Sequence, residues 1–386
     1  MFLIDDRPVP YYDPWDQSLS HRMASLKRGR PRVAYFYDRP DNSTFRYRVY
    51  NMIQALAAAD SAMSAAYFCL ADLEHDDHII DACDALVVCR AAYGSAVNRL
   101  VTKARGRGRK VFFDVDDLIF DTRYAHLIVN TLDQDLSHPN LWEFWFAYIG
   151  RIGGTLRLCD HAIVTNDFLA ERVREFNAMP VSVIPNFLNL EQIAMSDAIY
   201  AGKQASGFAR NDKIHLGYFS GTPTHNRDFA LIADTLARLL RQDPRLVLRV
   251  AGYFQMPDCL APLGDRIEVH PFRDFVNLQA LIGATEINLV PLQDNIFTNC
   301  KSDLKYFEAA AVGSISIASP TAVLRQTIQD GVNGYLANTF DWPGKIHRII
   351  DTIDTYAAMA KMSHDDVRRT YHWSVQAKAI ERVIAS

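Results

Sequence analysis

The sequence has no apolar run that approaches the ~20 residues needed to span a membrane, and its amino terminus is acidic and interrupted by proline. It also has no surplus of basic residues, since 41 Lys and Arg face 45 Asp and Glu and give a formal net charge of -4. A basic surface able to hold a nucleic-acid backbone is therefore not expected. Membrane spanning, secretion and nucleic-acid binding are all disfavoured.

Cysteine is scarce, and the six residues form no C-x-x-C pair and no cluster with histidine. Most of them lie in apolar runs, which is typical of reduced thiols in the core of a cytoplasmic protein. The histidines show no spacing of metal ligands, and no Ser/His/Asp order is recognisable, so we expect neither a metal nor a cofactor. The cysteines are Cys69, Cys83, Cys89, Cys159, Cys259 and Cys300.

What the sequence does have is room for two domains, because 386 residues exceed one comfortable core. Short β-branched or aromatic runs alternate with stretches of helical spacing, a pattern typical of parallel sheets covered on both faces. We therefore predict an α/β protein with two tandem, doubly wound, Rossmann-like domains. The expected parts are an extension (1–30), a first domain (31–187), a linker (188–212), a second domain (213–341) and a helical tail (342–386).

Ligands in such folds bind at the carboxyl ends of the strands, so two tandem sheets predict a cleft between the domains. The clearest local motif is YFSGTPTHNRDF, from Tyr218 to Phe229, in which a strand, a small-residue loop and a helix follow one another. Gly221 permits close approach of backbone N–H groups, and His225 adds a hydrogen bond, so the loop suits a phosphate. The simpler interpretation is a tight turn before a capped helix. The motif matches neither dinucleotide-binding nor P-loop patterns.

A second motif, TNCKSDLKYFEAAAVG, begins at Thr298 and contains Lys301, Lys305 and Glu308. The last two share a helix face, and Lys301 lies at the entrance of that helix. An ammonium neutralises a departing diphosphate, and a carboxylate accepts hydrogen bonds from a sugar diol. The alternative is an exposed helix pair that contributes about 0.3–0.5 kcal/mol.

With these motifs the chain from Lys213 to about Asn338 resembles the donor-binding domain of GT-B glycosyltransferases of family 4 (glycosyl transferases group 1), of the bacterial polysaccharide type. The glycine loop, the later Glu of an E-x7-E element and a D-G-x-N-G turn at 330–334 are present, but Cys300 stands where the first Glu is expected. The donor-binding residues that the resemblance implies are Gly221, Thr222, His225, Arg249, Asn299, Lys301, Ser302, Lys305 and Glu308.

The resemblance implies metal-independent transfer of a hexosyl or deoxyhexosyl group from a nucleotide-diphosphate sugar to a hydroxyl of a glycan or lipid-linked saccharide, in surface polysaccharide biosynthesis. It implies retention more than inversion of anomeric configuration, no cofactor, and a tail that crosses back to the first domain. The first domain would then bind the acceptor. Its candidates are Ser43, Arg46 and Arg48, and the two arginines cannot share a helix face, so we expect at most one of them in the cleft.

The sequence KVFFDVDDLIFDTR delivers Asp114, Asp116 and Asp117 to the end of a buried strand. Three interpretations are open. The first is the metal-binding D-x-D of GT-A enzymes, which the second-domain motifs disfavour. The second is a haloacid-dehalogenase-like phosphatase with Asp114 as nucleophile and Asp116 as general acid, and the third is an acidic element that faces the acceptor. On the third, Asp116 or Asp117 orients or deprotonates the acceptor hydroxyl. The expected catalytic residues are Asp116, Asp117 and Lys301.

Two further alternatives stay open. The missing first Glu favours a non-catalytic accessory protein that binds sugar nucleotides or glycans. The basic run KARGRGRK, 103–110, is either a solvated loop or a docking patch for anionic lipid headgroups or a lipid diphosphate, which would place a cytoplasmic protein at the inner face of the membrane.

Overall fold

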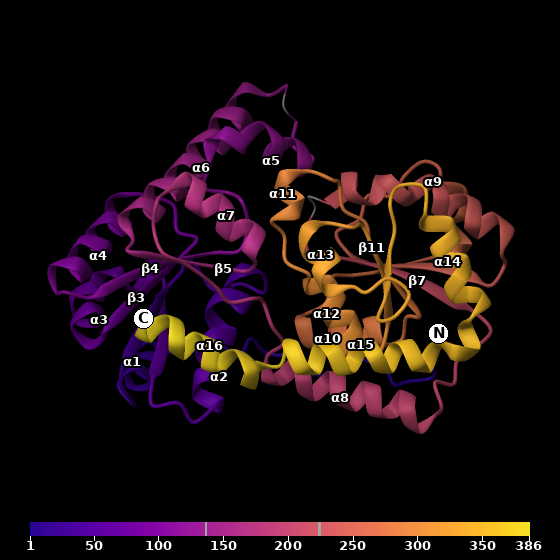
Figure 1. The fold of residues 1–386 in the computed structure, drawn as a ribbon, viewed down its shortest axis with the longest axis horizontal. Helices are drawn as coiled ribbons and strands as arrows, with labels where there is room; N and C mark the ends of the chain where they lie inside the picture. The colour runs from indigo at the N-terminus through magenta and orange to yellow at the C-terminus, as the bar shows by residue number, and fades with distance from the viewer. Residues whose placement is uncertain (136, 223–224) are drawn as a thin grey trace.

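The computed structural model describes residues 1–135, 137–222 and 225–386 and contains two parallel sheets of six strands each. The first sheet has the order β2-β1-β3-β4-β5-β6, and the second has the order β12-β11-β10-β7-β8-β9. Helices cover both sheets, and the two resulting domains lie side by side (Figure 1). The predicted α/β class with two doubly wound domains is confirmed.

The first sheet is built from short strands that are nearly fully buried except for the half-buried edge strand β6, as the apolar runs predict for a sheet covered on both faces. Its strands are β1 (Arg32–Phe36), β2 (Ser64–Phe68), β3 (Ala85–Cys89), β4 (Lys110–Val115), β5 (His161–Val164) and β6 (Val181–Val183). Its helices are α1 (Leu19–Leu26), the π-helical turn η1 (Arg46–Tyr50), α2 (Asn51–Ala58), α3 (Asp76–Ala82), α4 (Ser95–Gly106), α5 (Ala125–Thr131), α6 (Pro139–Leu158) and α7 (Asp167–Phe176).

The second sheet repeats the arrangement around its own apolar core. Its strands are β7 (Ile214–Ser220), β8 (Leu246–Gly252), β9 (Ile267–His270), β10 (Ile287–Val290), β11 (Ile315–Ala318) and β12 (Tyr335–Leu336). Its helices are α9 (Asn226–Gln242), α10 (Phe275–Gly283), α11 (Ile296–Asn299), α12 (Leu304–Ala311) and α13 (Ala322–Thr327).

The stretch 188–212, expected as a linker, contains the helix α8 (Leu190–Ala205). Asn189 caps this helix, and Gln192 completes a capping box with it. The helix packs against α10 and α12, so it adds a layer to the second domain. The connection between the domains is therefore the short segment before α8.

Both ends of the chain cross between the domains. Phe2 is buried in the core of the second domain, whereas α1 packs against the first sheet. The tail comprises α14 (Trp342–Asp351), α15 (Tyr356–Thr370) and α16 (Trp373–Ala385), and α16 packs against α2 of the first domain. Figure 1 accordingly shows the amino terminus on the second domain and the carboxyl terminus on the first. None of the helices in the described ranges is long and apolar enough to traverse a bilayer.

Candidate active site between the domains

A cleft of about 560 Å³ lies between the carboxyl ends of the two sheets and is lined by both domains. This is the position that the parallel topology predicts. The structure brings most of the predicted site residues into this one space. They are Ser43, Arg46, Asp116 and Asp117 from the first domain, and Gly221, Thr222, His225, Lys301, Ser302, Lys305 and Glu308 from the second.

The loop after β7 forms one wall of the cleft. His225 Nδ1 lies 2.9 Å from Asp228 Oδ2, and burial lowers the pKa of His225 to about 4. A neutral imidazole bonded in this way donates from Nδ1 to the carboxylate, which fixes the orientation of the ring. Asp228 is held in turn by Gln293, whose Nε2 donates to its Oδ1 over 3.0 Å. Residues 223 and 224 of the loop lie outside the described residues.

The two predicted lysines both reach the cleft. Lys305 Nζ donates to the backbone oxygen of Phe219 over 2.9 Å, at the end of β7, and burial lowers the pKa of Lys305 to about 8. Lys301 Nζ lies 3.6 Å from Asp117 Oδ1 and 4.6 Å from the ring centroid of Phe297. The site thus holds two ammonium groups near the phosphate-type loop, one of which loses its proton close to physiological pH.

Glu308 lies at the bottom of the cleft and is 5% exposed. Its Oε1 accepts hydrogen bonds from Tyr47 Oη and, over 3.0 Å, from Gln192 Nε2. Arg46 Nη2 lies 3.5 Å from the same oxygen. The carboxylate is therefore held by groups from both domains, and a ligand diol would bind beside them.

The acidic pair on the first domain faces the lysines. Asp116 Oδ2 accepts from Thr44 Oγ1 over 2.9 Å, and Asp116 Oδ1 accepts from Arg90 Nη1 over 3.1 Å. Burial raises the pKa of Asp117, although the neighbouring Lys301 acts in the opposite direction. A carboxylate whose pKa is raised is a better proton acceptor, so Asp117 suits a general base.

Asp114 has a structural place beneath this pair. Arg48 donates to both of its carboxylate oxygens, over 2.8 and 3.0 Å, and both side chains are buried. Arg48 also donates to Ile184 O and Asn186 Oδ1. Arg48 therefore does not line the cleft, because its guanidinium makes these hydrogen bonds inside the first domain. A carboxylate held bidentately out of the cleft does not suit the nucleophile of a phosphatase, which disfavours that alternative.

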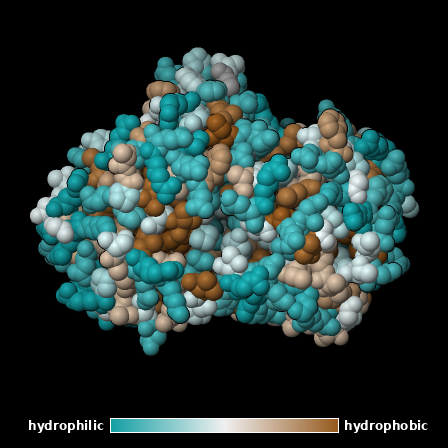
Figure 2. Space-filling model, in the orientation of Figure 1, coloured by the Kyte–Doolittle hydropathy of each residue, from teal (hydrophilic) through white to brown (hydrophobic). Residues whose placement is uncertain are grey.

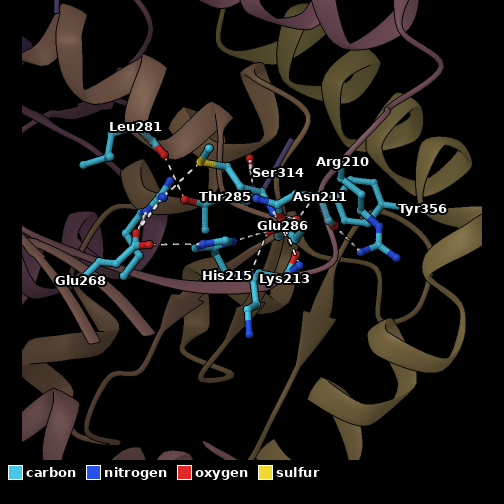
Figure 3. Close-up of polar contacts among 12 residues, drawn as sticks. Arg210, Asn211, Lys213, His215, Glu268, Leu281, Thr285, Glu286, Ser314 and Tyr356 are labelled. Carbon is cyan, nitrogen blue, oxygen red and sulfur yellow. Dashed lines mark hydrogen bonds and ion pairs between the residues drawn. The ribbon is translucent and has the colours of Figure 1, made fainter. Parts of the chain in front are cut away.

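Arg249 also lies away from the cleft. It stands three positions before the end of β8, which is about 10 Å along a strand. Its register partner on β9 is Glu268, and Arg249 Nη2 lies 2.7 Å from Glu268 Oε2. Figure 3 shows Glu268 beside His215 and Glu286, in a polar cluster within the second domain. Arg249 therefore balances this cluster and is not placed to bind a donor.

Asn299 and Cys300 also face away from the cleft. Asn299 ends α11, where its Oδ1 accepts from Ala322 N over 2.6 Å and its Nδ2 donates to Asn295 O. Cys300 is fully buried among apolar residues of the first domain, and its backbone oxygen accepts from Asn166 Nδ2 over 2.8 Å. The position at which the resemblance expects a sugar-binding Glu is thus part of the contact between the domains.

Several residues that line the cleft were not predicted from the sequence. Arg90 follows β3 directly, and the ends of β8 and β9 contribute Tyr253, Phe272 and Arg273. The rings of Tyr253 and Phe272 are half exposed, with centroids 6.3 Å apart. The signal that identifies all four is their position just after a strand of a parallel sheet.

The basic run at 103–110 carries no free positive patch. Lys103 bonds Asp76 and Asp77, Arg107 bonds Asp77 and Asp81, and Arg105 lies 3.2 Å from Asp160. These partners favour a solvated surface over a docking patch, but the prediction of a loop is wrong for most of the run, because 103–106 form the last turn of α4 and Lys110 begins β4. In the part of the chain that the structure describes, no group of three His, Cys, Asp or Glu residues is arranged to hold a metal ion.

Residues 214–354 match the family model described as "Glycosyl transferases group 1". Solved structures of similar fold include Anabaena Alr3699/HepE with UDP and glucose (13% identity, 92% of this chain and 99% of that chain, TM-score 0.61) and the sucrose-phosphate synthase of Thermosynechococcus elongatus (16% identity, 92% and 98%, TM-score 0.62). The pneumococcal O-GlcNAc transferase GtfA is similar over 78% of this chain and 57% of that chain (12% identity, TM-score 0.54).

A search of curated protein sequences found no significant match. At these identities the structural likeness shows the fold, and the family model identifies the second domain. The second domain thus matches the glycosyl transferases group 1 family, and the two-domain architecture of the chain is that of the GT-B fold.

Proposed function

We propose that this protein transfers a sugar from a nucleotide-diphosphate sugar to an acceptor hydroxyl. The observation that carries the proposal is the pairing of Lys301 and Lys305, on the donor side, with Asp116 and Asp117, on the facing domain, within one cleft. Cations suited to a leaving diphosphate and carboxylates suited to an acceptor proton thus lie on opposite walls of the same space.

The donor would bind along the second domain. Its diphosphate would lie between the loop at Gly221 and the ammonium groups of Lys301 and Lys305, while Glu308 would accept hydrogen bonds from a ribose or sugar diol. The half-exposed rings of Tyr253 and Phe272 would stack on the base. The Anabaena protein of the same fold was crystallised with UDP and glucose, which supports this class of donor.

In the reaction the bond between the anomeric carbon and the diphosphate oxygen breaks, and the acceptor oxygen bonds to that carbon. Lys301 stabilises the charge that develops on the departing diphosphate, and Asp117 accepts the acceptor's proton. Asp116 and Arg90 hold the facing wall in place. From the family that the second domain matches we infer a metal-independent reaction with retention of configuration and a hexosyl or deoxyhexosyl donor. Retention in a single displacement requires the acceptor oxygen to attack from the side on which the diphosphate leaves, so Asp117 would accept the proton on that side, where it lies 3.6 Å from Lys301.

The acceptor would bind on the first domain, beside Ser43 and Arg46. We propose a glycan or lipid-linked saccharide acceptor, as in surface polysaccharide biosynthesis. The six cysteines are free thiols, which accords with a reaction in the cytoplasm.

A thermal-shift screen against UDP, GDP, ADP and dTDP sugars tests donor binding. We expect at least one nucleotide sugar to raise Tm, and we expect Lys301→Met to reduce that rise while Lys361→Met leaves it unchanged. Lys361 is a suitable control because it is 64% exposed and pairs only locally, with Asp365. A screen in which no nucleotide sugar raises Tm would contradict the proposal.

The second candidate is a non-catalytic sugar-nucleotide or glycan-binding accessory protein. The burial of Cys300 favours it, because the cleft has no carboxylate from that position. Binding of a nucleotide sugar without any hydrolysis or transfer would support this candidate over the enzyme.

A further inference from the structure

The helices α5 and α6 form a projection that rises above the first sheet, beside the cleft (Figure 1). Only the second half of α6 is buried, from Ile149 onward, where it packs on α4 and the core of the first domain. The first half extends beyond that core. It carries five aromatic residues within seven positions, namely Trp142, Phe144, Trp145, Phe146 and Tyr148.

The outermost rings of this projection face solvent. Phe144 is 60% exposed and Phe146 is 47% exposed. Trp142, Trp145 and Tyr148 are half-buried behind them, and Phe144 stacks on Tyr148 with 6.1 Å between ring centroids. Figure 2 shows a small group of hydrophobic atoms on this projection, in addition to the larger hydrophobic areas over the two domains. Such a concentration of exposed aromatic rings marks an interaction surface.

The charge and shape of the projection identify the partner. Between Pro139 and Gly150 the only charged residue is Glu143, and Arg151, the next cation along the helix, donates to the backbone oxygen of Tyr93, so the aromatic segment itself offers no cation to an anionic headgroup or an acidic protein. Phe144 and Phe146 point in directions about 200° apart around the helix, so the rings surround a convex tip. A convex apolar tip is accommodated more easily by a fluid lipid bilayer than by the flat surface of a folded protein. Trp and Tyr behind it are the residues enriched where protein meets the lipid headgroup region.

The same projection is continuous with the cleft. Trp145 of α6 and Leu132, at the end of α5, both line the space that contains Asp116 and Asp117. A surface docked at Phe144 and Phe146 would therefore lie beside the acceptor wall of the cleft. An amphipathic acceptor would keep its hydrocarbon in the lipid while its sugar entered the cleft.

We infer that the aromatic tip of α6 inserts into an uncharged lipid surface and presents the cleft to lipid-linked acceptors. The vesicle contact stands on the exposed rings alone, whereas the class of acceptor rests on the proposed function. Vesicle binding is measured without any nucleotide sugar, so its failure and a failure of donor binding are separate results.

The test is co-sedimentation of the full-length protein with phosphatidylcholine vesicles, together with quenching of tryptophan fluorescence by brominated phosphatidylcholine. We expect binding and quenching for the wild type, and a loss of about tenfold or more in affinity for Phe144→Ser/Phe146→Ser. The matched control is Phe340→Ser, on the second domain, because Phe340 is 93% exposed. This control should bind as the wild type does, and all three proteins should share one Tm.

Four results would overturn the inference. The first is no binding to phosphatidylcholine vesicles, and the second is binding that the double substitution leaves unchanged. The third is a concentration-dependent dimer that the double substitution abolishes, since a second copy of the chain would then cover the tip. Binding that requires an anionic lipid would also contradict it, because the tip has no cation.

Discussion

Lys301 Nζ lies 3.6 Å from Asp117 Oδ1, and this contact joins the second-domain wall of the cleft to the first-domain wall. Lys301 belongs to the segment before α12, and Asp117 follows β4. Their ion pair therefore forms only when the two domains face each other. Lys301 also affects the electrostatics of Asp117. The ammonium opposes the rise in the pKa of Asp117 that burial causes.

Replacement of Lys301 by Met should lower kcat by about 10²- to 10³-fold, because a positive charge aimed at the leaving group is lost. It should also shift the acidic limb of the pH–rate profile upward. Asp117 acts as a base only when it is ionised, and removing the ammonium raises its pKa further. Steady-state kinetics between pH 5 and 9 measure both effects. If kcat falls with no shift of the acidic limb, Asp117 is not the base.

Replacement of Glu308 by Gln should raise the KM for the nucleotide sugar by about tenfold to 100-fold, because a hydrogen bond to a charged acceptor is weakened. The chain offers a matched control in Glu191, which accepts from Tyr50 Oη over 2.6 Å and from Gln54 Nε2 over 2.8 Å but does not line the cleft. Glu191→Gln should leave KM unchanged. Equal effects of the two substitutions would show that the loss is structural.

Lys305 predicts a pH dependence of donor binding. Its pKa is lowered to about 8 by burial, so the ammonium is present below pH 8 and is lost as the pH rises through that value. The affinity for a nucleotide sugar should therefore be highest below pH 8 and fall above it. Titration calorimetry between pH 6.5 and 9.5 measures this slope, and Lys305→Arg should flatten it because guanidinium stays charged. A slope that persists in Lys305→Arg would belong to another group.

The buried pair of Arg48 and Asp114 predicts a stability effect independent of ligand. Arg48→Met and Asp114→Leu should each lower the free energy of unfolding by about 3–5 kcal/mol, because each leaves an unpaired charge in the core. The double variant should lose less than the sum of the two. Urea-induced unfolding of the four proteins gives the coupling energy. Strictly additive losses would mean that the two side chains do not stabilise each other.

The sequence predicted the architecture because strand alternation and helix periodicity are local patterns. It predicted Lys301, Lys305 and Glu308 because their spacing and their position after a strand are also local. The place of Arg249 depended on Glu268, which is distant in sequence, and the place of Arg48 depended on Asp114. Neither partner can be assigned from the spacing of the arginine alone.

The helical character of 188–212 was detectable but missed. Its polar composition indicated a linker, whereas Asn189 and Gln192 form a capping box that marks the start of α8. The exposure of Phe144 and Phe146 was not predictable, because an aromatic helix segment is buried in most folds and projects only where its partner helix ends.

Turnover of the donor is the most direct consequence of the proposed reaction. The measurement is release of nucleoside diphosphate from the nucleotide sugar that raises Tm, by the wild type, by Glu308→Ala and by Glu191→Ala. A glycosyltransferase with this cleft should hydrolyse the donor slowly without acceptor, and this activity should be lost in Glu308→Ala and kept in Glu191→Ala. A wild-type protein that binds the donor but releases no nucleoside diphosphate, with or without acceptor saccharides, would contradict the proposed transferase activity.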